Sequence, residues 1–69
     1  MTDKELIKYK SMTADEIIAA LEEKYSDDVD ALEDIERAKK NVAYLKSKKD
    51  GQAAQQYALE IAGMLSYWN

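Results

Sequence analysis

The sequence predicts an all-α fold, a small helical bundle in which two short N-terminal helices pack on a long antiparallel helical hairpin. The 69 residues include no proline and only two glycines, so the residues that interrupt helices are almost absent. Valine and isoleucine recur at helical spacing and do not alternate as they would in a strand. A chain of this length forms one domain, residues 1–69. The helices are expected at about 3–10, 14–25, 28–49 and 52–68.

Two local motifs predict where the first two helices begin. Thr2 is followed three residues later by Glu5, and Thr13 by Glu16. Each pair has the pattern of a capping box, in which the threonine and glutamate side chains accept hydrogen bonds from backbone N–H groups that the first turn leaves without partners.

The third and fourth helices are predicted as a hairpin. Ser26, Asp27 and Asp28 offer N-caps for the third helix. The apolar period continues across residues 21–32, so the second and third helices could also be one long helix. Gly51, just past a lysine-rich helix end, is the expected stop signal. The heptad-like core positions of the third helix are Ala31, Ile35, Ala38, Val42 and Leu45.

The residue types that are missing exclude most kinds of catalytic and metal-binding site. The chain has no cysteine and no histidine, so disulfides, thiolate zinc sites and the common catalytic triads are absent. No phosphate-binding glycine loop is present. We therefore expect no catalytic residues, no cofactor, no metal ion and no enzymatic activity. No apolar run is long enough to cross a membrane and the N-terminus lacks a signal-peptide core, so we expect a soluble cytoplasmic protein.

The charges are segregated along the chain. Residues 15–36 hold ten acids and one lysine, a net charge of −9, whereas residues 37–49 hold six basic residues and no acid, a net charge of +6. This pattern allows antiparallel self-association of the third helix, with the acidic half of one copy on the basic half of another. The alternative is a solvated helix with internal pairs Glu33–Arg37 and Glu36–Lys40.

An acidic patch precedes and opens the third helix. One hypothesis is that it imitates nucleic-acid phosphates on a basic partner; another is that it is an ordinary acidic surface. An EF-hand loop needs glycine at its sixth position and glutamate at its twelfth, and neither register of these acids provides them, which argues against a calcium site. The patch consists of Asp27, Asp28, Asp30, Glu33 and Asp34.

A basic face follows on the same helix, on the side opposite Ile35 and Val42. A tyrosine among cations, away from the apolar stripe, is a candidate contact site for a partner. A solvated face is the plainer interpretation. The charged contact face consists of Arg37, Lys40, Asn41, Tyr44 and Lys48.

The last helix has more apolar surface than one side needs. Its main apolar arc is Ala54, Tyr57, Ala58, Ile61, Met64, Leu65 and Trp68. Small side chains recur every four residues at Ala54, Ala58, Ala62 and Ser66, which lets another helix approach closely. The expected partner or dimer interface includes Leu59, Gly63, Tyr67 and Trp68. The alternative is that the first helix folds over this side.

These observations predict a small acidic non-enzymatic protein that acts by protein–protein binding, as a regulator or inhibitor of a host or partner protein. We expect a homodimer or a higher homo-oligomer and one further protein partner. The alternative is a nucleic-acid-binding or nucleic-acid-mimicking regulator that uses the charged faces of the third helix. Compact acidic helical chains are common among small phage and bacterial regulators, which is an analogy of class only.

Overall fold

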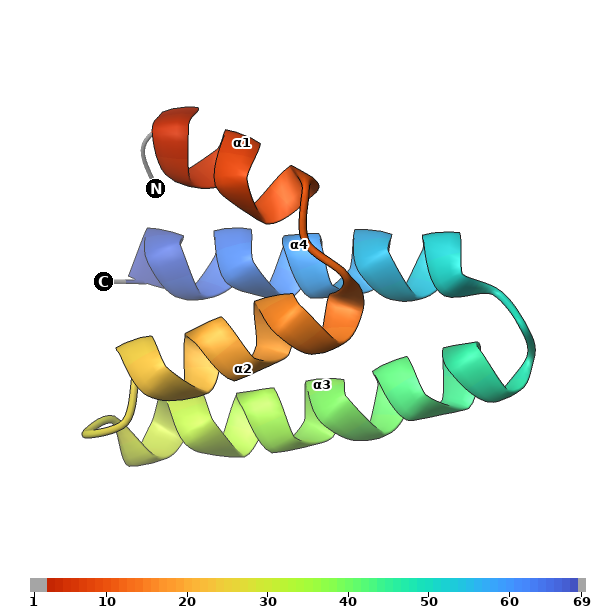
Figure 1. The fold of residues 1–69 in the computed structure, drawn as a ribbon. Coiled ribbons are helices and arrows are strands. Elements are labelled where there is room, and N and C mark those ends of the chain that lie inside the picture. Colours follow the sequence, from red (N-terminus) through yellow and green to blue (C-terminus); the bar gives the residue numbers. More distant parts are fainter. Residues whose placement is uncertain (1–2, 69) are drawn as a thin grey trace.

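The computed structural model describes the backbone of residues 3–68, and the side chains within that range other than those of Asp3, Leu6 and Trp68. It confirms the all-α class: four helices make a small bundle, and the described range contains no strand. In Figure 1, α3 and α4 run antiparallel and α1 lies beside α4, while α2 packs against both α3 and α4. The helices are α1 Asp3–Lys10, α2 Ala14–Lys24, α3 Val29–Ser47 and α4 Gly51–Trp68.

The start of α2 has the capping box that the sequence predicts. The Glu16 backbone N–H donates to the Thr13 hydroxyl at 3.2 Å, and the Thr13 N–H donates to the Glu16 carboxylate at 3.0 Å. The hydrogen bonds from the Thr13 backbone and then from its hydroxyl lower the pKa of Glu16, because they favour the ionised carboxylate. The other expected box includes Thr2, which lies outside the described residues.

A turn separates α2 from α3, so these helices are not continuous. The N–H of Tyr25 still donates to Leu21 O, but the next turn closes through Asp28 N–H and Tyr25 O at 3.0 Å. Asp28 then has extended backbone angles, and its carboxylate accepts from Ala31 N–H at 3.1 Å. This N-cap lets α3 begin in a new direction while the apolar period carries on through the turn.

The turn between α3 and α4 corrects the expected role of Gly51. The residue in the left-handed region is Lys49, with φ of 60°, and no glycine has a positive φ in the described chain. Asp50 N–H donates to Leu45 O at 3.1 Å and Lys49 N–H to Lys46 O at 2.9 Å, which together form a Schellman motif. Asp50 also caps α4 by accepting from Ala53 N–H at 3.0 Å, so Gly51 is the first residue of α4.

The core lies where α2, α3 and α4 meet. Its largest fully buried side chains are Ile17, Leu21, Ile35 and Val42. On α4 the buried ridge is Ala54, Ala58, Ala62 and Leu65.

Part of the predicted apolar arc of α4 is therefore wrong. Met64 is 38% exposed, whereas Tyr57 and Ile61 are partly buried and pack against the core. Three of the four residues of the small-residue ridge, Ala54, Ala58 and Ala62, are packed inside the chain, because alanine lets the neighbouring helices approach more closely than tyrosine or isoleucine would.

Two substitutions test the turn: one introduces a glycine at position 49 and the other removes the glycine at position 51. Lys49→Gly should raise the free energy of unfolding by about 1 kcal/mol, because glycine adopts a positive φ without the steric cost that lysine has. Gly51→Ala should raise it by about 0.4–1 kcal/mol, because the added Cβ meets no atom within 4 Å and helix propensity improves. Urea denaturation measures both. A loss of stability in Gly51→Ala would contradict the observed turn.

Candidate interaction surface

The five residues of the predicted contact face lie together on the outward side of α3. Arg37, Lys40, Asn41, Tyr44 and Lys48 are all exposed, whereas Ile35 and Val42 on the opposite side are fully buried. The reason is the spacing of three and four residues, which keeps them within one side of a helix that turns about 100° per residue. This group is called the contact face below.

The contact face has one exposed aromatic ring. Tyr44 is 61% exposed, and the Lys48 ammonium lies 5.6 Å from the centre of its ring. The Asn41 side-chain amide donates to the Tyr57 hydroxyl of α4 at 2.8 Å, which ties the edge of the face to the hairpin. Arg37 lies 3.8 Å from the Asp34 carboxylate. The contact face is thus anchored at one edge, and its aromatic ring is exposed to solvent.

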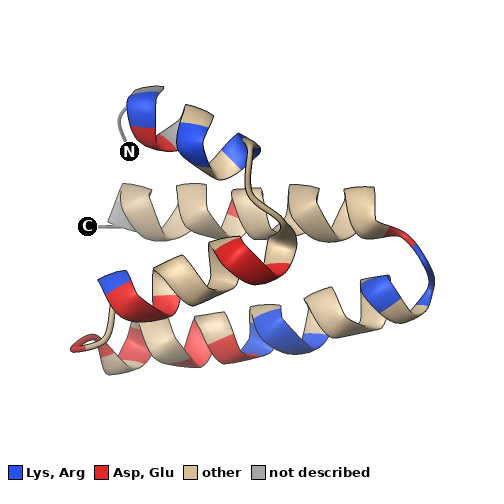
Figure 2. Cartoon of the chain, viewed as in Figure 1, with Lys and Arg blue, Asp and Glu red and all other residues tan. Residues whose placement is uncertain are grey.

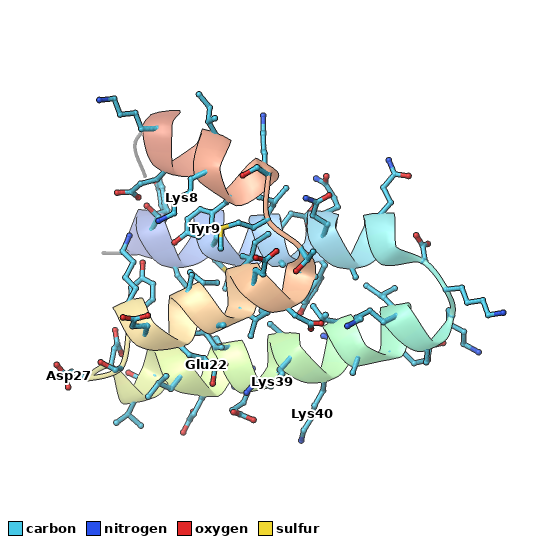
Figure 3. The ribbon with its side chains drawn as sticks, in the orientation of Figure 1. Lys8, Tyr9, Glu22, Asp27, Lys39 and Lys40 are labelled. Carbon is cyan, nitrogen blue, oxygen red and sulfur yellow. The ribbon has the colours of Figure 1, made fainter. Side chains whose placement is uncertain are left out.

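The charges on the side of α3 that faces α2 behave differently, because they pair across the two helices. Lys39 Nζ lies 3.0 Å from the Glu22 carboxylate, and Lys46 pairs with Asp15. The hydrogen bond with Glu22 raises the pKa of Lys39, because it favours the charged ammonium. In Figure 3, Lys39 and Glu22 lie next to one another, while Lys40 projects away from the bundle.

The two internal pairs predicted for α3 do not form in the described structure. Arg37 pairs with Asp34, and Glu36 with Lys39 at 3.7 Å, so both contacts span three residues instead of four. Lys39 pairs with Glu22 of α2 and also with Glu36. Because Glu36 pairs with Lys39, Lys40 has no acidic partner among the described residues.

The acidic patch divides between two places. Asp28 is occupied as the N-cap of α3, and Asp27 lies in the preceding turn. Asp30, Glu33 and Asp34 lie along α3 itself. No group of three described carboxylates is arranged to hold a metal ion. The acids are therefore spread over a surface and do not converge on one point.

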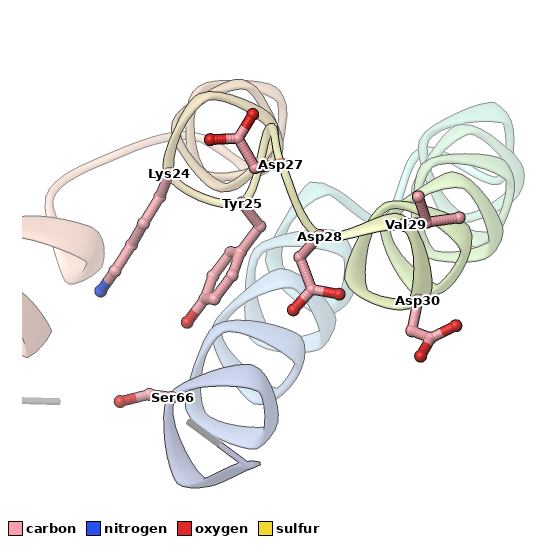
Figure 4. Close-up of a pocket in the computed structure, with 7 residues that line it drawn as sticks. All are labelled: Lys24, Tyr25, Asp27, Asp28, Val29, Asp30 and Ser66. Carbon is pink, nitrogen blue, oxygen red and sulfur yellow. The ribbon is translucent and has the colours of Figure 1, made fainter.

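Two open hollows lie at opposite ends of the bundle. The hollow at the α2–α3 turn, about 660 Å³ in volume, is lined by Lys24, Tyr25, Asp28 and their neighbours together with Ser66 of α4 (Figure 4). The other, about 430 Å³, lies between the α1–α2 link and the start of α4. Among the described residues no polar or charged side chain is buried. Neither hollow is therefore lined by a buried acid or base among the described residues.

The expected interface on α4 is only partly exposed. Leu59 packs against the core and Gly63 is half-buried, whereas Tyr67 is 90% exposed. The side chain of Trp68 lies outside the described residues. The positions of Leu59, Gly63 and Tyr67 lie within one side of the helix, because each four-residue step advances the row by only about 40°. The exposure of these residues is greatest at Tyr67.

One contact that sequence reasoning missed holds α1 in place. The Gln55 side chain of α4 donates to the carbonyl oxygens of Lys10 at 3.0 Å and Met12 at 2.7 Å. Tyr9 of α1 is buried, although Ile7 faces solvent. The C-terminal end of α1 is thus tied to the first half of α4. A glutamine among alanines gave no local signal of this long-range role.

The charges that are segregated along the sequence are also segregated on the folded chain. Figure 2 shows acids on the first half of α3 and basic residues from its middle onward, with few charges on α4. Comparison with protein-family models, characterised proteins and solved structures finds no match to the chain. None of the described helices is long and apolar enough to span a membrane. The outward side of α3 is therefore the candidate site on physical grounds alone.

Neighbouring charge reversals on α3 should have different effects on the monomer. Lys39→Glu should lower the urea midpoint, because it replaces the attraction to Glu22 with repulsion. Lys40→Glu should leave the midpoint unchanged, because Lys40 has no ion pair with a described residue. Both are measured at low protein concentration. Equal losses in the two variants would contradict the division of α3 into a paired side and an outward side.

Proposed function

We propose that this chain is a small non-enzymatic binding protein that recognises a protein partner through the contact face of α3 and acts as a regulator or inhibitor of it. The observation that carries the proposal is Tyr44, a large ring left 61% exposed between Arg37, Lys40 and Lys48. The core is closed without it. Its exposure therefore adds nothing to the packing of the chain.

The chemistry of the contact face suits protein recognition. Tyrosine and arginine are enriched among the residues that dominate binding energy at protein interfaces. The Lys48 ammonium near the ring, together with the hydrogen bond from Asn41 to Tyr57, restricts the face before binding. Such pre-ordering reduces the entropy lost when a complex forms.

The absence of enzymatic activity is proposed from the residue types and the open form of both hollows. The chain has no histidine or cysteine. None of its described carboxylates is buried. Shifted acid–base pairs of the kind that enzymes use require a closed and partly apolar site.

Nucleic acid is a weaker candidate partner for the same face. Within about two helical turns before Arg37 lie Asp30, Glu33 and Asp34, which would repel a phosphate backbone. The whole chain has a net charge of −4. Nucleic acid is therefore treated as one outcome of the experiment that follows.

Site-specific photocrosslinking tests the proposal. A benzophenone amino acid placed at Tyr44 should form protein adducts in lysate of the native host, because this ring position faces the partner. The same probe at Lys8, which is exposed on α1, serves as the matched control and should form few. Adducts that nuclease removes, or no adducts at position 44, would contradict protein binding through this face.

A further inference from the structure

The outward side of α3 has two halves of opposite charge. At 1.5 Å per residue the whole helix is about 28 Å long, and the sign changes near its middle, between Asp34 and Arg37. The acidic half consists of Asp30, Glu33 and Asp34, and the basic half of Arg37, Lys40 and Lys48.

Four of these six charges form no ion pair with a described residue of the same chain. Among the described residues, the one ion pair on this side joins Arg37 to Asp34. Asp30, Glu33 and Lys40 form no ion pair with any described residue, whereas Lys39 and Lys46, which face α2, are both paired across helices. Apart from the exposed pair of Arg37 and Asp34, the outward charges can therefore meet a partner without breaking an ion pair inside the chain.

We propose that the partner seated on this side of α3 is a second copy of the same chain, docked antiparallel about a twofold axis. The inference rests on the proposed function and identifies the molecule that binds the contact face. An antiparallel arrangement sets the acidic half of each copy on the basic half of the other, whereas a parallel one sets like charges together. A twofold interface requires this self-complementarity.

Charge also selects the register. With the axis level with residues 35 and 36, Arg37 of each copy lies level with Asp34 of the other, and Lys40 lies within one turn of Asp30 and Glu33 of the other. An axis level with residue 37 would instead bring the two copies of Arg37 together. Like-charge contacts of this kind are how interfaces reject wrong registers.

The proposed interface is small and polar, and this determines the protein concentrations at which association can be measured. One helix on one helix buries less than the area of standard stable complexes, about 1,200–2,000 Å² in total. Charge pairs determine orientation more than affinity, and in this register the exposed Tyr44 lies level with residue 27 of the other copy, at the rim of the interface. We therefore expect a micromolar dissociation constant.

Sedimentation equilibrium of the full chain tests the inference. Between about 1 µM and 1 mM the mass should rise from 7.9 kDa toward twice that value. Raising NaCl from 50 to 500 mM should weaken association about tenfold, because salt screens exposed charges. A chain that stays monomeric at 1 mM, or a dimer that does not respond to salt, would overturn the inference.

A charge exchange tests the geometry. Arg37→Glu with Lys40→Glu makes an acidic variant, and Glu33→Lys with Asp34→Lys makes a basic one; each should be monomeric alone, and their mixture should associate. Lys4→Glu with Lys8→Glu, the same charge change on exposed positions of α1, should dimerise normally. Circular dichroism checks that each variant is helical, and Lys40→Glu alone, which should weaken the dimer, replaces any variant that is not.

The outcomes separate this inference from the proposed function. A mixture of the two charge variants that stays monomeric, or variants that dimerise as the parent chain does, overturns antiparallel pairing through α3. If the parent chain is monomeric while the probe at Tyr44 still crosslinks to a different protein, the proposed function survives without the self-pairing. If the probe at Tyr44 gives no adduct to any protein, both are wrong.

Discussion

The structure depends on how closely α4 can approach α2 and α3. A chain of 69 residues without cysteine has no disulfide to stabilise it, so helix packing must exclude water from a thin core. Ala54, Ala58 and Ala62 turn toward the centre and are almost completely buried. Because their side chains are short, the larger Ile17, Leu21, Ile35 and Val42 can fill the space between the helices.

This packing determines which surfaces remain available. It uses the apolar sides of α2 and α3, and the charges next to that junction pair across it, as Lys39 does with Glu22. The outward side of α3 then has no packing role. Its opposite charges and exposed Tyr44 are the features from which the proposals of partner binding and antiparallel self-pairing are built.

Features set by a few neighbouring residues could be predicted from the sequence. The capping box of Thr13 and Glu16 is an example, because both hydrogen bonds join residues three apart. The contact face on α3 follows equally well from helical spacing. The role of Gly51 could not be foreseen, because Asp50 competes as the cap of the next helix and moves the left-handed residue back to Lys49.

Features that depend on how helices are rotated against one another were harder to predict. The last helix is apolar over more than half its circumference, so the sequence allowed several buried sides, and Met64 was assigned to the wrong one. The ion pairs of Lys39 and Lys46 join α3 to α2 across many residues of chain, and the hydrogen bonds of Gln55 do the same for α1. Sequence spacing within one helix gives no signal for such contacts.

Substitution at the alanine ridge tests the central claim most directly. Ala58→Leu should lower the free energy of unfolding by about 1–3 kcal/mol, because the added methylenes force the helices apart in a closed core. Ala43→Leu is the matched control on the exposed side of α3 and should change it by less than about 0.5 kcal/mol. Urea denaturation of both variants gives the comparison. Equal stability of the two variants would contradict an account in which close approach at Ala58 holds the bundle together.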